Sequence, residues 1–182
     1  MSSKQLQRII ITGGPGSGKS TLISKLSHRG YKCFPEAGRG IIQNQVSIGG
    51  NALPWGDRGA FAEFMLCWEM RSWSEAEEYA EACFYDRGIP DVAGYLRLIN
   101  HDTPDYLENA IAKFRYNQTV FIAPPWREIF AQDAERKQSF EEAVLTYHSM
   151  IETYQQYGYQ LLELPCIPAE DRADFILSKI AT

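Results

Sequence analysis

Short apolar runs alternate along the chain with longer segments in which apolar residues recur every three or four positions. The short runs are rich in β-branched and aromatic residues, which is typical of strands buried on both faces. They predict strands at residues 6–12, 31–35, 82–86, 119–123 and 160–164. The longer segments have helical spacing and contain no internal proline. They predict helices at residues 19–29, 37–46, 58–80, 92–99, 106–114, 140–157 and 170–180.

Strands that alternate with helices in this way predict an α/β fold, with a parallel sheet covered by helices on both faces. The 182 residues are 45% hydrophobic and 13% aromatic, enough for one well-buried core and too few for two comfortable domains. We therefore expect one domain over residues 1–182. No segment approaches the roughly 18 apolar residues of a membrane helix, so we expect a cytoplasmic protein without a membrane partner.

The charge and the cysteines narrow the class of ligand. A formal net charge of −5 gives no basic field for a polyanion, which weighs against nucleic acid and favours a small-molecule ligand. The four cysteines are widely separated and form no Cys-x-x-Cys pair, so they suggest neither a zinc site nor a redox couple. The three histidines show no metal-ligand spacing either.

The segment GGPGSGKS at residues 13–20 matches the phosphate-binding pattern of glycine, four residues, glycine, lysine and serine. It begins where a predicted strand stops and ends where a helix starts. Backbone N–H groups of such a loop can surround a phosphate, Lys19 can reach the β and γ oxygens, and Ser20 can ligate Mg²⁺. We expect ATP with Mg²⁺ to bind Gly13, Gly14, Pro15, Gly16, Ser17, Gly18, Lys19, Ser20 and Thr21.

Asp86 and Arg87 follow the third predicted strand, and ligands of open α/β sheets bind beyond the carboxyl ends of the strands. Asp86 could hold Mg²⁺ through water or act on an acceptor. Arg87 could bind the acceptor or the charge that develops on the transferred group. A purely structural pair is the alternative.

Glu36 ends the second predicted strand and places another carboxylate on the same rim. A base there could orient and deprotonate an attacking hydroxyl, since phosphoryl transfer requires mostly positioning and charge neutralisation. Arg39, three residues later, would lie on the same side of a helix. Alternatively, Glu36 is a carboxylate favoured by the dipole at a helix start.

Residues 124–138 follow the fourth predicted strand and are typical of a lid. Mobile arginines such as Arg127 and Arg136 suit transient stabilisation of a transition state. The alternative is a solvated charged helix. An acceptor pocket is predicted between the second and third strands, with Trp55, Phe64 and Arg71 as its binding residues. Aromatic residues at helical spacing are more often core, so that interpretation stays open for Phe64.

Three motifs together resemble a known family. They are GGPGSGKST at 13–21, GYKCFPEAGR at 30–39 and YDRGIPD at 85–91. The chain resembles the P-loop family of predicted ATPases and kinases known as AAA-like ATPase domain 28, which includes nicotinamide riboside kinase domains. It is also similar to deoxynucleoside and thymidylate kinases. We expect the chain to differ from ring-forming AAA machines, because a chain ending at Thr182 has no room for their second helical domain.

The resemblance implies a three-layer α/β/α P-loop NTPase with five parallel strands in the order 2-3-1-4-5 and a lid after the fourth. It implies that adenine binds near residues 164–172, which adds Arg172 to the ATP site. It also places Glu36 where deoxynucleoside kinases keep their base, and Asp86 with Arg87 where such kinases keep an acid and arginine pair. No signature names the acceptor.

These features predict a monomeric or dimeric kinase that transfers the γ-phosphate of ATP to a nucleoside or nucleotide-like acceptor. Its predicted catalytic residues are Lys19, Glu36, Asp86, Arg87, Arg127 and Arg136, and its acceptor residues are Glu36, Arg39, Trp55, Phe64, Arg71 and Arg87. One alternative is an ATPase or nucleotide-dependent switch that acts on a protein partner. A second is a 5′-hydroxyl polynucleotide kinase.

Overall fold

The computed structural model describes residues 6–79, 81–131 and 137–180. Within these residues, five parallel strands form one sheet in the order β2-β3-β1-β4-β5. The strands are β1 (Arg8–Gly13), β2 (Lys32–Phe34), β3 (Cys83–Asp86), β4 (Thr119–Ala123) and β5 (Gln160–Glu163). This confirms the predicted α/β fold and its strand order.

The helices are α1 (Lys19–His28), α2 (Ala37–Ile48), α3 (Arg58–Glu75), α4 (Ile89–Leu98), α5 (Asp105–Lys113), α6 (Phe140–Gln156) and α7 (Ala169–Ile180). Two short 3₁₀ turns, η1 (Ala76–Glu78) and η2 (Arg127–Ile129), complete the described elements. The helix predicted to reach residue 80 ends at Glu75, and residue 80 lies outside the described residues. Helix α4 begins three residues earlier than predicted, because Pro90 is tolerated in a first helical turn.

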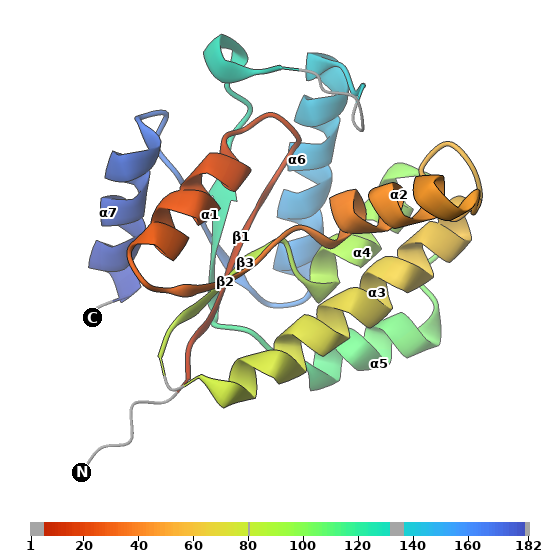
Figure 1. The fold of residues 1–182 in the computed structure, drawn as a ribbon, viewed down its shortest axis with the longest axis horizontal. Coiled ribbons are helices and arrows are strands. Elements are labelled where there is room, and N and C mark those ends of the chain that lie inside the picture. The colour runs from red at the N-terminus through yellow and green to blue at the C-terminus, as the bar shows by residue number, and fades with distance from the viewer. Residues whose placement is uncertain (1–5, 80, 132–136, 181–182) are drawn as a thin grey trace.

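The sheet separates two apolar layers, and alternate residues of its strands point into opposite ones. Ile9 and Ile11 pack with α1 and α7, whereas Ile10 packs with residues of α3, α4, α5 and α6. Figure 1 shows α1 and α7 together on one side of the strands, with α2 lying along α3. Both faces of the sheet are therefore covered, which explains why its strands read as continuous apolar runs.

The parallel arrangement brings the carboxyl ends of all strands to one edge. Strand β1 lies at the centre, between β3 and β4. The glycine-rich loop leaves β1 at this edge, Glu36 follows β2, and Arg87 follows β3. The fold thus collects the three predicted motifs at the place where open α/β sheets bind their ligands. No helix in the described ranges is long and apolar enough to cross a membrane.

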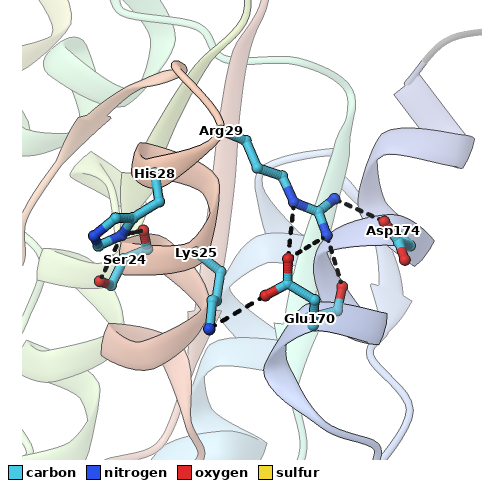
Figure 2. A network of polar contacts seen from close by, with 6 residues as sticks. All are labelled: Ser24, Lys25, His28, Arg29, Glu170 and Asp174. Carbon is cyan, nitrogen blue, oxygen red and sulfur yellow. Dashed lines mark hydrogen bonds and ion pairs between the residues drawn. The ribbon is translucent and has the colours of Figure 1, made fainter.

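Helix α7 is held against α1 by a network of ion pairs (Figure 2). Arg29, which caps the end of α1, donates to Glu170 at 2.8 Å and to Asp174 at 2.7 Å. Lys25 lies 3.3 Å from the other carboxylate oxygen of Glu170. Exposed pairs of this kind contribute little stability individually. Together with the apolar contacts below them, they fix the position of α7 relative to the glycine-rich loop that precedes α1.

Candidate active site

The glycine-rich loop wraps tightly because two of its residues adopt left-handed backbone conformations. Gly16 has φ of 69° and Gly18 has φ of 86°, a region that other residues rarely adopt. A Cβ atom on Gly14 would lie 2.4 Å from the carbonyl oxygen of Ala143 in α6, so this position also needs glycine for close packing. The side chain of Lys19 donates to the Gly14 carbonyl at 2.9 Å and lies across the loop.

Arg172 braces the loop from the far end of the chain. Its side chain is only 1% exposed, donates through Nη1 to the carbonyl of Ser17 at 2.7 Å, and donates through Nε to the carbonyl of Pro165 at 2.7 Å. Its Nη2 atom has no hydrogen-bond partner within the described part of the chain. Burial lowers the pKa of Arg172 below its usual value. The residue predicted to contact adenine is thus also a support for the phosphate loop.

A cavity of about 450 Å³ surrounds the outer face of this loop. Its walls come from the loop itself, the start of α2, the segment after β4 and the loop after β5. The ring of Phe130 lies against Gly16, and Ile129 lies against Gly18. The lining residues are Pro15, Gly16, Gly18, Lys19, Ser20, Thr21, Glu36, Arg39, Trp126, Ile129, Phe130, Ala131, Gln138, Ile167, Pro168, Ala169 and Arg172. Gly13, Gly14 and Ser17 lie behind this surface.

A second cavity of about 530 Å³ adjoins the first. Both are lined by Glu36 and Gln138, so Glu36 stands at their boundary. The second cavity is mostly apolar and contains three aromatic residues, one of which, Trp55, is 62% exposed at its mouth. Its lining residues are Glu36, Ile42, Pro54, Trp55, Phe61, Met65, Arg87, Asp91, Tyr95, Leu98, Lys137, Gln138, Glu142, Thr146 and Met150.

Arg87 lies at the polar end of the second cavity among carboxylates. Its Nε atom is 3.2 Å from Glu36 Oε1, and its Nη1 atom is 3.7 Å from Asp91 Oδ1. Burial acts to lower the pKa of Arg87, but the fields of Glu36, Asp91 and Asp86 outweigh it, so its pKa is raised. The guanidinium therefore stays charged. Glu36 is the residue that precedes α2; it makes no side-chain capping bond to that helix, and its carboxylate forms an ion pair with Arg87.

Asp91 is a site residue to which the sequence analysis gave no role, although it is the last residue of the motif YDRGIPD. Its carboxylate accepts hydrogen bonds from the Thr12 hydroxyl, the Gly88 backbone N–H and the Tyr154 hydroxyl. These bonds fix the start of α4 and hold Asp91 beside Arg87. The main chain of Arg87 has φ of 71°, an uncommon conformation for a residue with a Cβ atom. The Asp91 carboxylate and its three hydrogen-bond donors therefore fix the conformation of the turn that carries Arg87.

Tyr95 is a second residue that sequence reasoning missed. Its hydroxyl is buried and has no hydrogen-bond partner among residues 6–79, 81–131 and 137–180. Its ring meets Phe61 edge to face, with ring centroids 5.5 Å apart, and both residues line the second cavity. Burial raises the pKa of Tyr95, so the hydroxyl keeps its proton at neutral pH. It can therefore donate a hydrogen bond to a molecule in the cavity.

Glu69 of α3 lies behind the Arg87 cluster and is almost fully buried. Its pKa is raised well above the usual value, first by burial and then by the nearby charges of Asp91, Asp86 and Glu36. The folded protein therefore keeps a proton on Glu69 at pH values where the unfolded chain has released it. The stability that depends on this proton is complete below the usual glutamate pKa and is lost as pH rises toward the folded-state pKa.

Replacing Glu69 by glutamine should remove this pH dependence. We expect the free energy of unfolding of Glu69→Gln, relative to the wild type, to increase between pH 5 and pH 8 by at most about 1.4 kcal/mol per pH unit. Urea unfolding at several pH values measures the difference. Glu63→Gln, at an exposed position of the same helix, is the matched control. A difference that stays constant with pH would show that Glu69 is ionised in the folded protein.

Outside the glycine-rich loop, four predicted site residues of the described ranges line neither cavity, and one of them is Asp86, which is only 3% exposed at the end of β3. Phe64 and Arg71 line a separate groove between α2 and α3, of about 620 Å³, and not the cavity that holds Trp55. Arg127 is exposed, lies 3.7 Å from Glu141 and packs over Phe140, so it lines neither cavity. Arg136 falls outside the described residues. Of residues 124–138, the described part contributes Trp126, Ile129, Phe130, Ala131 and Gln138 to the first cavity.

Ser20 and Asp86 were predicted to hold Mg²⁺, and their chemistry fits that ion. Ser20 lines the first cavity, and Asp86 ends β3 beside Ile11 of β1, from which the glycine-rich loop continues. A hydroxyl and a carboxylate supply the oxygen ligands that Mg²⁺ prefers. Magnesium usually keeps several waters and binds through one or two protein groups together with phosphates. Ser20 would contact the ion from the wall of the first cavity, whereas Asp86, which lines neither cavity, would act through water.

A five-stranded parallel sheet in this order, with a glycine-rich loop after its central strand, defines a P-loop NTPase with a kinase-like fold. The chain belongs to the AAA domain family, whose model matches residues 8–172. No curated protein sequence matches the chain at a significant level.

Solved structures with this fold include several kinases. Thymidylate kinase from Candida albicans matches with a TM-score of 0.70 and 16% identity, over 96% of this chain and 91% of that one. Deoxyadenosine kinase from M. mycoides with bound dATP matches with a TM-score of 0.59 and 16% identity, over 97% and 100%. The NadR protein in complex with NR matches with a TM-score of 0.69 and 14% identity, over 97% and 50%. At these identities, the likeness shows the fold.

Proposed function

We propose that this protein is a small-molecule kinase that transfers the γ-phosphate of ATP to a hydroxyl group of a nucleoside-like acceptor. Phosphate donor and acceptor would occupy the two adjoining cavities. The observation that carries the proposal is the position of Glu36, which lines both cavities where they meet. A protein that only hydrolysed ATP would have no need of a second, largely apolar cavity of about 530 Å³ beside its phosphate loop.

In the proposed reaction, Glu36 takes the proton of the acceptor hydroxyl while the hydroxyl oxygen attacks the γ-phosphorus. The new oxygen to phosphorus bond forms as the bond between the γ-phosphorus and the β,γ-bridging oxygen breaks, and ADP leaves with that oxygen. Lys19 and the backbone N–H groups of the loop stabilise the negative charge on the phosphates. Bound Mg²⁺, held by Ser20 and Asp86, would neutralise part of the same charge.

Arg87 would orient the base and the acceptor together. Its ion pair with Glu36, at 3.2 Å to Oε1, would hold the carboxylate in one orientation. The second oxygen, Oε2, would then take the proton of the acceptor. Trp55, Phe61 and Tyr95 would hold the ring of the acceptor. Arg39 lies with Glu36 in the wall of the donor cavity, so we assign it to the phosphates of ATP and not to the acceptor.

A panel of acceptors tests the proposal directly. ADP release from Mg·ATP is measured with no acceptor, and then with nucleosides, nucleoside monophosphates, nicotinamide riboside and a 5′-hydroxyl oligonucleotide. We expect slow turnover alone and at least tenfold stimulation by one class of small molecule. Stimulation by the oligonucleotide, with strong salt dependence, would instead establish a polynucleotide kinase. A flat panel with slow basal hydrolysis would favour an ATPase or switch that acts on a protein partner.

A further inference from the structure

Asp91 connects three parts of the candidate active site. Its carboxylate accepts hydrogen bonds from the hydroxyl of Thr12, which directly precedes the glycine-rich loop, and from the hydroxyl of Tyr154 in α6. It also accepts the backbone N–H of Gly88 at 2.8 Å, where α4 begins. The same oxygen that accepts the Thr12 bond lies 3.7 Å from Nη1 of Arg87. One side chain therefore joins the strand that leads into the donor site, helix α6 and the arginine of the second cavity.

These contacts suit an ionised carboxylate in a fixed position. The two hydroxyls and the N–H group all donate to Asp91, and an ionised carboxylate is an acceptor only. Burial, and then the negative charge of Asp91, raise the pKa of Tyr154 well above its usual value, so its hydroxyl keeps the proton that it donates. The side chain of Asp91 is 7% exposed. Arg87 thus has a negative partner whose position depends on the protein's own hydrogen bonds and not on a ligand.

Glu36, the other ion-pair partner of Arg87, changes its charge in the proposed reaction. Before the transfer, its carboxylate faces Nε of Arg87 at 3.2 Å. When it takes the proton of the acceptor hydroxyl, it becomes neutral. The side chain of Arg87 is only 13% exposed, so water solvates the guanidinium poorly, and a buried charge without a counter-charge is strongly unfavourable. The reaction therefore removes one of the two carboxylates of these ion pairs while Arg87 still has to keep its place.

Other acidic groups near Arg87 do not replace the charge that the base loses. Asp86 acts on the guanidinium from β3, but its carboxylate is the one proposed to act on Mg²⁺. Glu69 of α3 adds no charge, because burial and the neighbouring carboxylates raise its pKa well above the usual value and it keeps its proton. Asp91 is therefore the carboxylate that stays charged beside Arg87 throughout the transfer step.

We propose that Asp91 is a positioning residue, which holds the guanidinium of Arg87 in place while Glu36 is neutral. The inference rests on the proposed function and deepens it, because it separates the roles of the two carboxylates. Glu36 moves the proton, and Asp91 supplies a constant counter-charge. Thr12 and Tyr154 belong to the same arrangement, since their hydroxyls hold Asp91.

The order of the Arg87 side chain in solution tests the proposal without any transfer reaction. Glu36→Gln mimics the neutral base, and ¹⁵N relaxation of the Nε–Hε signal, assigned by its absence in Arg87→Lys, reports the motion of the guanidinium. We expect an order parameter of about 0.85 in the wild type and in Glu36→Gln, and a value below about 0.6 in Glu36→Gln/Asp91→Asn. A flexible Arg87 in Glu36→Gln alone, or a rigid one in the double variant, would overturn the inference.

Asparagine at position 91 removes the charge and can keep the local structure. With its amide oxygen in place of Oδ2, it still accepts the bonds from Gly88 and Tyr154, so the start of α4 is retained. The matched control is Asp105→Asn, the same change at an exposed position in the first turn of α5. Combined with Glu36→Gln, it should leave Arg87 as rigid as in Glu36→Gln alone.

The single variant Asp91→Asn provides a second measurement that does not require the double variant to fold. Glu36 still pairs with Arg87 in this variant until it takes the proton. We expect kcat with the best acceptor of the panel to fall at least about tenfold, and KM for ATP to stay within about twofold. An unchanged kcat would overturn the inference, and so would an equal loss of kcat and ATP affinity, which would indicate general damage to the fold.

The two measurements separate the inference from the proposed function. If no acceptor in the panel is phosphorylated, the kinase function is refuted. A rigid Arg87 in Glu36→Gln and a flexible one in Glu36→Gln/Asp91→Asn would still support the hold of Asp91 on Arg87. Conversely, acceptor phosphorylation that Asp91→Asn leaves at the wild-type rate would establish the kinase and overturn the role of Asp91.

Discussion

Replacing Lys19 by alanine should weaken the binding of Mg·ATP by about 100-fold or more and abolish measurable turnover. The side chain lies across the loop and lines the donor cavity, where its ammonium can reach the β and γ oxygens of a bound nucleotide. A hydrogen bond to a charged group contributes up to about 3 kcal/mol, which corresponds to a factor of this size. Calorimetric titration with Mg·ATP measures the affinity, and ADP release measures the turnover.

Lys25→Ala is the matched control for this experiment. Lys25 belongs to the same helix, but it is exposed and pairs with Glu170 (Figure 2). We expect nearly unchanged ATP affinity and turnover in this variant. If Lys19→Ala binds and turns over ATP like the wild type, while both variants unfold at similar temperatures, the glycine-rich loop is not the nucleotide site.

Replacing Glu36 by glutamine should lower the rate of phosphate transfer by 10²- to 10⁴-fold, the usual contribution of a general base. The affinity for ATP should stay within about twofold, because phosphate binding relies on the loop and Lys19. Glutamine occupies a similar volume, and Arg87 keeps its ion pair with Asp91 at 3.7 Å when the charge of Glu36 is removed. Single-turnover transfer to the best acceptor of the panel, together with calorimetric ATP binding, measures the two effects separately.

Glu128→Gln provides the comparison, because Glu128 is exposed in η2 and lines neither cavity. Its transfer rate should equal that of the wild type. Normal transfer by Glu36→Gln would remove Glu36 as the base. Asp86, the other carboxylate that the sequence predicted to be catalytic, would then be the next candidate.

Sequence alone predicted the features that depend on residues close together in the chain. The glycine-rich loop needs only the local pattern of residues 13–20, and the strands needed only their apolar runs. Glu36 and Arg87 could be placed on one rim because parallel strands bring their carboxyl ends together. Their ion pair was not predicted, although both residues were singled out. The sequence offered Asp86 as the adjacent partner of Arg87, whereas the guanidinium of Arg87 forms ion pairs with Glu36 at 3.2 Å and with Asp91 at 3.7 Å.

The acceptor cavity could be predicted only in part, because its walls come from elements distant in sequence. Helix α3 shows why. Phe61 and Met65, four residues apart, line the second cavity, whereas Phe64 and Arg71 face the groove beside α2. One helix thus presents two apolar stripes, and the spacing of apolar residues does not tell which stripe meets a ligand. Tyr95 was not predicted as a site residue, because its hydroxyl is buried in the cavity only as a result of the packing of α4 against α3.

The bond between Arg172 and the carbonyl of Ser17 has a consequence for synthesis of the chain. The two residues are 155 positions apart, and the phosphate loop precedes Arg172 in the chain. A ribosome therefore produces the loop early but its brace late, and domains generally fold as units during translation. Until residue 172 emerges, the nascent loop lacks this support. Competence to bind nucleotide should consequently be acquired only after residue 172 has emerged, and not when the glycine-rich motif first leaves the ribosome.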